Sequence, residues 1–304
     1  MTTAALRDAE RAPAPPRRQF LRSEAARNYA LMSPSLALLT LTLAAPVILL
    51  VLYSLWTQRG LELDTRATLG QYEAVLGREF YLSLFLRSVA ISSLVTLFTV
   101  ALAYPMAYFV AFKVKRHKFV WLVLLNIPFW TSYLLRVFAW KVILGFNGVI
   151  NSGLLSLGLI AKPLAFLLYN PTAVVLTLAH AYAAFAILPI YVSLEKIDRS
   201  LLEAAADLGD GPWKRFWRIT LPLSLPGVIG AAVLIFIPTT GDYVTPTLVG
   251  GSDGVMIANI IQVQFGRVNN WPLGAALAVS SMMAVGAIAV LAIQALRLAA
   301  GRIR

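Results

Sequence analysis

Residues 171–194 read PTAVVLTLAHAYAAFAILPIYVSL, a run of 24 residues that contains no Asp, Glu, Lys or Arg. A helix needs about 20 apolar residues to cross a membrane, because each residue adds about 1.5 Å to a hydrocarbon path of about 30 Å. This run is therefore long enough to span a bilayer. Five further runs resemble it, and together they predict an all-α membrane protein with six transmembrane helices at about 31–56, 88–112, 119–136, 171–194, 221–241 and 270–296.

The composition of the whole chain favours the same class. Of its 304 residues, 59% are hydrophobic and 13% are charged, whereas a soluble domain carries about 25% charged residues. With a mean hydropathy of +0.75, a water-soluble globule is excluded. The absence of Cys excludes disulfides, thiolate metal sites and Cys nucleophiles, and the two histidines, His117 and His180, do not suggest a metal site.

The net charge of +12 indicates the orientation of the helices. Cytoplasmic loops of membrane proteins collect Lys and Arg. With Arg87 and Arg136 at the ends of spans set aside, six spans with both termini in the cytoplasm place 18 of these residues inside and six outside. If 142–161 also crossed, the count would be 12 on each side, so we expect 142–170 to be an outer-surface segment with a short helix against the bundle. The basic tail, 1–30, is expected to be disordered, and 31–300 to form the transmembrane domain. Because the basic residues lie between apolar spans, nucleic acid is not an expected partner.

The loop between the fourth and fifth spans, 195–226, reads EKIDRSLLEAAADLGDGPWKRFWRITLPLSLP. Ser200 and Glu203 have the spacing of a capping box and predict the start of a helix. Gly209 is expected to end this helix, and Pro212 to begin a second one. The loop is therefore predicted to hold two short amphipathic helices, joined by a sharp turn, on the cytoplasmic face.

Small residues at the centre of this helix pair favour contact with another protein. Ala204, Ala205 and Gly209 leave the backbone accessible to a partner's groove, and nearby charges can set the orientation. The alternative is an interfacial helix that anchors the loop on lipid, because Trp and Arg also favour that boundary. The pattern by itself leaves both interpretations open.

The loop resembles a known signature. Three residues separate Glu203-Ala204-Ala205 from Gly209, and nine more separate Gly209 from Ile219-x-Leu221-Pro222. This spacing is similar to the EAA motif of bacterial ABC-importer permeases. The resemblance implies the type I ABC importer permease fold, with a coupling helix in 195–220 that docks onto an ATPase subunit. The docking residues it implies are Glu203, Ala204, Ala205, Gly209, Ile219, Leu221 and Pro222.

Segments outside the loop indicate which group of these permeases the chain resembles. Residues 128–140, 144–151 and 241–251, with Trp271-Pro272, are similar to the first permease subunit of spermidine/putrescine importers. The resemblance implies a permease that forms half of the pathway for a small cationic solute, such as a polyamine, in the bacterial inner membrane. It also leaves open another small nitrogenous or organic solute, such as an amino-acid derivative or an opine.

The chain has no G-x-x-x-x-G-K-[ST] phosphate loop. We therefore expect a transport subunit rather than an enzyme, without a cofactor or metal of its own, and ATP and Mg on a separate ATPase. The resemblance implies an ATPase dimer, a second permease in a heterodimer, an extracytoplasmic solute-binding protein and membrane lipid as partners. An autonomous secondary carrier, or a membrane anchor without transport, is the competing class.

One carboxylate is expected near a membrane boundary outside the inner loop. Asp242 follows the fifth span, and an ionisable residue at such depth is a candidate for cation binding. Tyr243, Trp130 and Tyr133 are expected to add aromatic faces for the same cation. The alternative is that Asp242 caps a helix or pairs with Arg136.

Overall fold

The computed structural model describes residues 24–60 and 62–301. Most of the predicted disordered tail, 1–23, lies outside these residues, whereas its last residues belong to helix α1. The chain divides into two units, one ending at Leu52 and one beginning at Tyr53. The first unit is helix α1, Glu24–Ser54, which reaches into the second unit by its last residues and holds Pro34 and Pro46 within it.

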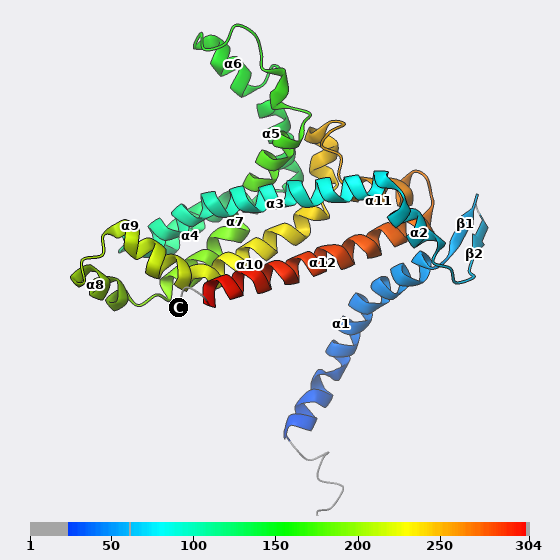
Figure 1. Ribbon diagram of the computed structural model, residues 1–304, viewed down its shortest axis with the longest axis horizontal. Coiled ribbons are helices and arrows are strands. Elements are labelled where there is room, and N and C mark those ends of the chain that lie inside the picture. The colour runs from blue at the N-terminus through cyan, green and yellow to red at the C-terminus, as the bar shows by residue number, and fades with distance from the viewer. Residues whose placement is uncertain (1–23, 61, 302–304) are drawn as a thin grey trace, which may run out of the picture. The chain divides into compact units, whose positions relative to one another are not determined.

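The second unit is almost entirely helical (Figure 1). Its α-helices are α2 (Gly70–Gly77), α3 (Glu79–Tyr108), α4 (Lys118–Asn126), α5 (Tyr133–Leu144), α6 (Val149–Ser156), α7 (Pro171–Glu195), α8 (Arg199–Asp207), α9 (Pro212–Arg215), α10 (Leu221–Thr240), α11 (Ile257–Gly266) and α12 (Trp271–Gly301). Short 3-10 and π turns are η2 (Phe109–Lys113), η3 (Ile127–Trp130), η4 (Ala165–Leu167), η5 (Phe216–Thr220) and η6 (Pro246–Gly250). Strands β1 (Thr57–Arg59) and β2 (Glu62–Asp64) form an antiparallel hairpin with Thr57 opposite Asp64.

Helices α3, α7 and α10 form the centre of the bundle, and α12 packs against α10. Their shared core is aliphatic and includes Val95, Leu178, Ile190 and Ile235. At the crossing of α7 and α10, a Cβ on Gly227 would come within 2.4 Å of the Ser193 Cβ. The absence of a side chain at this position therefore allows the two helices to approach closely.

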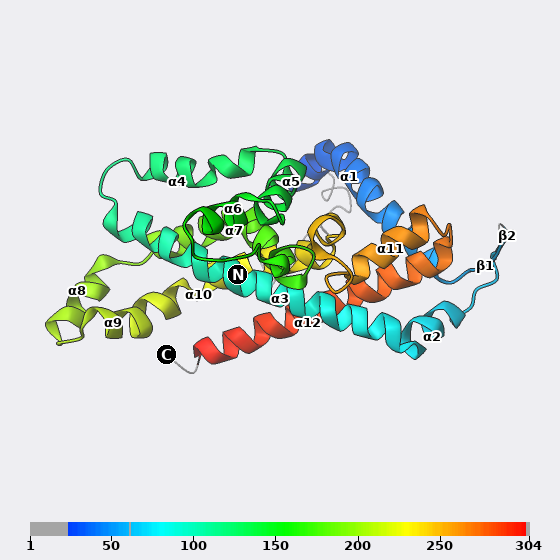
Figure 2. The same cartoon turned by 90° about the horizontal axis from the view of Figure 1, so that it is seen from above.

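The bundle has two distinct ends (Figures 1 and 2). Helices α8 and α9 lie at the end where α12 terminates, and α2, α11 and the β1–β2 hairpin lie at the opposite end. A second apolar cluster joins α2 and the start of α3 to α11 and α12, and contains Tyr81, Leu84, Ile257 and Leu277. The segment that resembles a docking motif is thus at one end of the spans.

Six helical segments of the described chain are long and apolar enough to cross a membrane. They are Asn28–Ser54, Glu79–Lys113, Tyr133–Ser156, Pro171–Glu195, Pro212–Thr240 and Trp271–Ala295. The second begins well before the predicted 88–112, because the helix includes Arg87, the charged residue that precedes the uncharged run. The fifth begins before the predicted 221–241, because α9 and η5 run without interruption into α10.

The third predicted span, 119–136, is wrong as a continuous helix. The chain is helical to Trp130, becomes extended at Thr131 and resumes as α5 at Tyr133. Pro128 lacks an amide hydrogen, and the Thr131 hydroxyl donates to the Pro128 carbonyl at 2.7 Å, so local polar groups replace helical hydrogen bonds here. The third candidate span, Tyr133–Ser156, therefore includes part of the segment that we expected on the outer surface.

Candidate functional site

Helix α8 carries the predicted docking motif, and its start differs from the prediction. The N-cap is Asp198, whose carboxylate accepts a hydrogen bond of 3.0 Å from the Ser200 amide. This hydrogen bond holds the pKa of Asp198 below its usual range. The predicted Ser200–Glu203 capping box is therefore wrong. Asp is as good a capping residue as Ser, and Asp198 stands two positions earlier.

The end of α8 agrees with the prediction for Gly209. Gly209 has a φ of +85°, in the left-handed region that favours glycine. Its amide donates to the Ala206 carbonyl at 2.9 Å, and the Asp210 amide donates to the Ala205 carbonyl at 2.9 Å. These two bonds form a Schellman motif, which satisfies carbonyls at the end of the helix. The backbone conformation at position 209 thus favours the glycine of the motif. The carbonyls that this turn satisfies belong to Ala205, within the motif, and to the neighbouring Ala206.

The chain after Gly209 folds back along α8 and forms a groove of about 420 Å³. Pro212 stands in the first turn of α9, as predicted, and the Arg215 guanidinium donates to the Leu202 carbonyl at 3.3 Å, which holds α9 to α8. The second helix of the loop is not a separate short helix, because it continues through η5 into α10. Residues lining the groove are Leu201, Ala204, Ala205, Leu208, Asp210, Lys214, Arg218 and Ile219.

The structure brings some of the predicted docking residues together and separates others. Ala204, Ala205 and Ile219 line the groove, whereas Glu203 is exposed on α8 and does not line it. Leu221 and Pro222 form the first turn of α10 instead. Leu208, which is 87% exposed at the tip of α8, is a groove residue that the motif does not contain. An apolar residue directly before the helix-ending glycine is the sequence signal that marks it.

One wall of the groove is organised by Asp210. Its carboxylate contacts Lys214 Nζ at 2.8 Å and the Arg218 guanidinium at 3.0 Å. The hydrogen bond from Lys214 and the charges of both cations hold the pKa of Asp210 below its usual range. The groove therefore presents small and apolar side chains beside a fixed cluster of charges.

The aromatic residues of α9 and η5 divide between two environments. Phe216 packs edge-on against Tyr104 and Tyr108 of α3, with ring centroids 5.7 and 6.3 Å apart. Trp213 and Trp217 contact each other and are exposed on the described chain. Phe216 thus attaches the loop to the bundle, and the two indoles remain available to lipid or to a partner.

The predicted solute-path residues lie elsewhere, around Asp242. Its Oδ1 accepts from the Val244 amide at 2.8 Å and the Thr245 amide at 3.4 Å, so the carboxylate caps the turn that follows α10. Its Oδ2 accepts a hydrogen bond from the Tyr133 hydroxyl, which also contacts Thr245 Oγ1 at 2.5 Å. The helix-capping alternative for Asp242 is thus present in the structure, and Tyr133 is joined to it.

Other residues near this cluster have separate contacts. The Arg136 guanidinium donates to the Ala181 carbonyl at 2.9 Å and lies 5.2 Å from the Phe129 ring centroid, and no ion pair joins it to Asp242 in the described chain. Trp130 and Tyr243 are exposed, and the side-chain partner of the Asp242 carboxylate in that part of the chain is Tyr133 instead. The cluster that the structure assembles is therefore Asp242, Tyr133 and Thr245.

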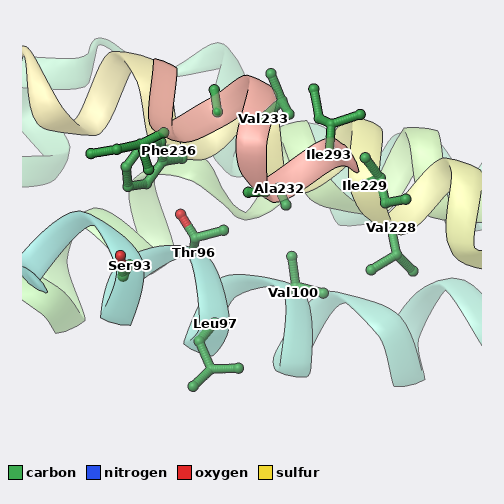
Figure 3. A pocket seen from close by; sticks show the side chains of 13 residues that line it. Ser93, Thr96, Leu97, Val100, Val228, Ile229, Ala232, Val233, Phe236 and Ile293 are labelled. Atoms are coloured by element: carbon green, nitrogen blue, oxygen red, sulfur yellow. The ribbon is translucent and has the colours of Figure 1, made fainter. Parts of the chain in front are cut away.

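A groove of about 340 Å³ between α3, α10 and α12 differs in character from both sites (Figure 3). Its lining is almost entirely aliphatic, and the Thr96 hydroxyl in its wall donates to the Ser92 carbonyl of its own helix at 2.7 Å. Such a lining suits hydrocarbon and offers no charge to a cation. It is therefore not a candidate for the solute site.

Comparison with known proteins shows the family to which this chain belongs. The family described as binding-protein-dependent transport system inner membrane component matches residues 77–297. The spermidine/putrescine transport system permease protein PotB of Escherichia coli (strain K12) is 36% identical over 72% of this chain and 79% of that protein. The inner membrane ABC transporter permease protein YdcU of the same organism is 32% identical over 69% of this chain and 70% of that protein.

Solved structures show a similar fold. A bacterial ABC transporter involved in the import of the acidic polysaccharide alginate aligns with a TM-score of 0.69 at 16% identity, over 92% of this chain and 96% of that chain. The same kind of transporter, in complex with an alginate pentasaccharide-bound periplasmic protein, aligns with a TM-score of 0.68 at 16% identity, over 90% and 93%. The six candidate spans therefore adopt the fold of ABC importer permeases.

Proposed function

Because the chain belongs to the family of binding-protein-dependent transport system inner membrane components, we propose that it is the permease subunit of an ATP-driven importer for a polyamine such as spermidine or putrescine. The observation that carries the permease role is the groove beside α8, at one end of the apolar helical bundle of the second unit. The solute class rests on the relatives named as spermidine/putrescine permeases.

The groove is the docking surface for the ATPase in this proposal. Its floor is formed by Ala204 and Ala205, so a partner's side chain or backbone can approach α8 closely. The cations Lys214 and Arg218, held by Asp210, set the orientation of the partner by charge. Glu203 is exposed on α8 outside the groove lining, so in this proposal its negative charge belongs to a second face of the docking helix.

Hydrolysis takes place on the partner. The ATPase dimer binds ATP and Mg, and its closure shifts the docked α8 helices. The spans then exchange between inward-open and outward-open states, because nucleotide binds one state more tightly than the other. This chain contributes half of the pathway in a type I permease fold, and a related second permease contributes the other half in a heterodimer. An extracytoplasmic binding protein delivers the solute.

In the proposed orientation in the bacterial inner membrane, both termini are cytoplasmic, and the ends of the bundle support this proposal. α12 terminates at the end where α8 and α9 lie, so a cytoplasmic α8 places the C-terminus in the cytoplasm (Figure 1). Tyr53, near the end of α1, lies 5.7 Å from Trp271 at the start of α12, measured between ring centroids. If α1 crosses the membrane, the N-terminus is then also cytoplasmic.

Asp242 is the proposed cation-binding group of the pathway, with Tyr133 and the exposed faces of Tyr243 and Trp130. An ionised carboxylate has about four acceptor positions, and the described chain fills three of those on Asp242. One position remains for an ammonium group. The hydrogen bonds around it fix the carboxylate before the cation arrives.

Reconstitution tests the proposal. The chain is purified with its ATPase, second permease and binding protein, and labelled spermidine and putrescine uptake is measured in proteoliposomes with ATP inside. We expect uptake that vanadate blocks, and Glu203→Lys is expected to abolish both ATPase co-purification and uptake. Glu62→Lys, a matched charge change in strand β2 at the opposite end, is expected to leave co-purification intact.

Three results would change the conclusion. Ion-gradient-driven flux by the lone chain would indicate a secondary carrier. The absence of flux under every condition would indicate an anchor. ATP-dependent uptake of an amino-acid derivative or an opine, with no uptake of polyamines, would keep the permease role and replace the solute.

A further inference from the structure

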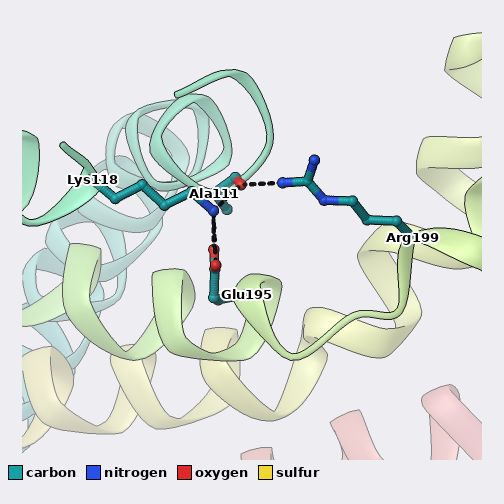
Figure 4. A network of polar contacts seen from close by, with 4 residues as sticks. All are labelled: Ala111, Lys118, Glu195 and Arg199. Atoms are coloured by element: carbon teal, nitrogen blue, oxygen red, sulfur yellow. Dashed lines mark hydrogen bonds and ion pairs between the residues drawn. The ribbon is translucent and has the colours of Figure 1, made fainter. Parts of the chain in front are cut away.

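The carbonyl oxygen of Ala111 is a point where two cationic side chains meet (Figure 4). Ala111 is buried in η2, at the end of the helix that begins with α3. Carbonyls in the last turn of a helix have no partner within it, and leaving one buried and unpaired is costly. Lys118 Nζ donates to this carbonyl at 2.9 Å, and the Arg199 guanidinium donates to it at 3.4 Å. Both cations also face the negative end of the helix dipole.

Lys118 also forms an ion pair with Glu195. The ammonium lies 2.7 and 2.9 Å from the two carboxylate oxygens, and the side chains are 22% and 42% exposed. Lys118 is the first residue of α4, and Glu195 is the last residue of α7. A helix dipole disfavours a cation at its N-terminus and an anion at its C-terminus. Neither charge is therefore explained by its own helix, and each is stabilised by the other.

The network connects helices that are otherwise loosely joined at this end. None of the residues of α4, all of which the structure describes, is buried. Helix α8 follows α7 after three residues, 196–198, and it has no covalent link of comparable length to α3 or α4. Arg199 in the first turn of α8 and Lys118 in the first turn of α4 thus share one acceptor on η2.

We infer that Lys118, Glu195 and Arg199 are positioning residues that transmit the displacement of α8 to α3 and α4. The inference rests on the proposed function, in which an ATPase moves α8. When α8 shifts, Arg199 moves with it and acts on the Ala111 carbonyl. Lys118 holds the same carbonyl and the end of α7, so α3, α4 and α7 move as one body. Without the network, α8 remains connected to the bundle through the chain to α7 and through α9 and η5, whose Phe216 packs on α3.

The experiment measures transport and hydrolysis in the same proteoliposomes. The full transporter is reconstituted with its binding protein, and labelled spermidine uptake is divided by ATP hydrolysed. Lys118→Met is expected to lower this ratio at least about fivefold, the low end of typical coupling between sites, while ATPase binding and hydrolysis persist. Lys118→Arg keeps both contacts and is expected to retain the ratio. The control is Lys115→Met, which removes an exposed lysine of the same loop.

A charge exchange distinguishes the effect of the ion pair on coupling from the effect of the contact with the Ala111 carbonyl. Lys118→Glu combined with Glu195→Lys restores a pair but places no donor on the Ala111 carbonyl from α4. We expect this double variant to remain uncoupled. Full coupling in either the exchanged variant or Lys118→Met would overturn the inference. A wild-type transporter without ATP-dependent uptake would instead contradict the proposed function.

A distance measurement covers the case in which a variant assembles poorly. The chain has no Cys, so Phe119→Cys in α4 and Ser200→Cys in α8 can carry a pair of spin labels on the otherwise unchanged protein. The distance between the labels is expected to stay the same with and without ATP and vanadate, because both helices move together. A distance that changes with nucleotide in the protein with an intact network would overturn the inference.

Discussion

The Tyr133 hydroxyl donates a hydrogen bond to the Asp242 carboxylate and so connects helix α5 with the turn that follows α10. The two residues are 109 positions apart in the sequence. Asp242 is 8% exposed and also accepts from the Val244 and Thr245 amides. The carboxylate is therefore held by two elements at once, and its charge and its position can be tested separately.

Asp242→Asn is expected to raise the KM for a polyamine about tenfold, which corresponds to about 1.4 kcal/mol, because the amide keeps a capping oxygen but loses the charge. Uptake kinetics with a fixed amount of assembled transporter measure this change. Tyr133→Phe is the control, since it removes one hydrogen bond and leaves the carboxylate charged. Equal changes of KM in the two variants would contradict a cation site at Asp242.

Gly209→Ala is expected to weaken ATPase binding about 5- to 30-fold. An alanine in the left-handed region costs about 1–2 kcal/mol, and the Schellman motif at the end of α8 requires that conformation. The matched control is Gly211→Ala, where a Cβ also meets no atom within 4 Å but φ is −65°. A Kd that changes equally in both variants would show that the backbone conformation of Gly209 is unimportant for docking.

Gly227→Ala is expected to lower the free energy of unfolding by about 1–3 kcal/mol, as overpacking does in a dense core. The new Cβ would lie 2.5 Å from the Pro189 carbonyl oxygen and 2.4 Å from the Ser193 Cβ. Gly230→Ala, on the same helix with no atom within 4 Å of its Cβ, is the control. Thermal unfolding in detergent measures both, and equal stability of the two variants would contradict the close crossing of α7 and α10.

Asp210→Asn is expected to weaken ATPase binding most strongly at low salt, because its partners Lys214 and Arg218 are 62% and 63% exposed and salt screens their charges. Lys214 keeps the pKa of Asp210 below its usual range. The stabilisation is therefore present above the ordinary pKa of about 4 and is lost as the pH falls through the lowered value. Between pH 6 and 8, Asp210 should contribute no pH dependence. Asp253→Asn, at another exposed position, is the control, and an equal salt effect there would contradict the assignment.

Single cysteines test the orientation. Leu208→Cys, at an exposed residue of the groove, is expected to react with a membrane-impermeant maleimide after the cells are opened and not before. Phe166→Cys, exposed between α6 and α7, is expected to react in intact cells. The reverse pattern would place α8 outside the cell and remove the basis for ATPase docking.

Local features of the loop were predictable from the sequence because they depend on single residues. Gly209 ends α8 and Pro212 starts α9, since few residues fit a left-handed cap or lack an amide hydrogen. The predicted N-cap was wrong because Asp198 and Ser200 both suit that position, and the helix begins after Asp198. The apolar run 171–194 coincides with α7, because a run of about 20 apolar residues is long enough for one membrane-spanning helix.

Features that join distant segments could not be predicted from the sequence. The ion pair of Lys118 with Glu195 spans 77 positions, and no local pattern indicates it. The interruption at Thr131 depends on a side-chain hydrogen bond that competes with the helix. The hydrogen bond of Tyr133 to Asp242 likewise requires the two elements to be packed together.

One helical segment runs from Pro212 to Thr240 and extends from the groove to the neighbourhood of Asp242. One tip carries Lys214 and Arg218 in the groove wall, and the other ends two residues before Asp242. This run includes the π turn η5, Pro226 and Pro238 but no non-helical residue, so we expect a tilt imposed at Pro212 to be carried along one continuous element toward that carboxylate. The docking groove and the proposed cation site are thus connected by the same helix.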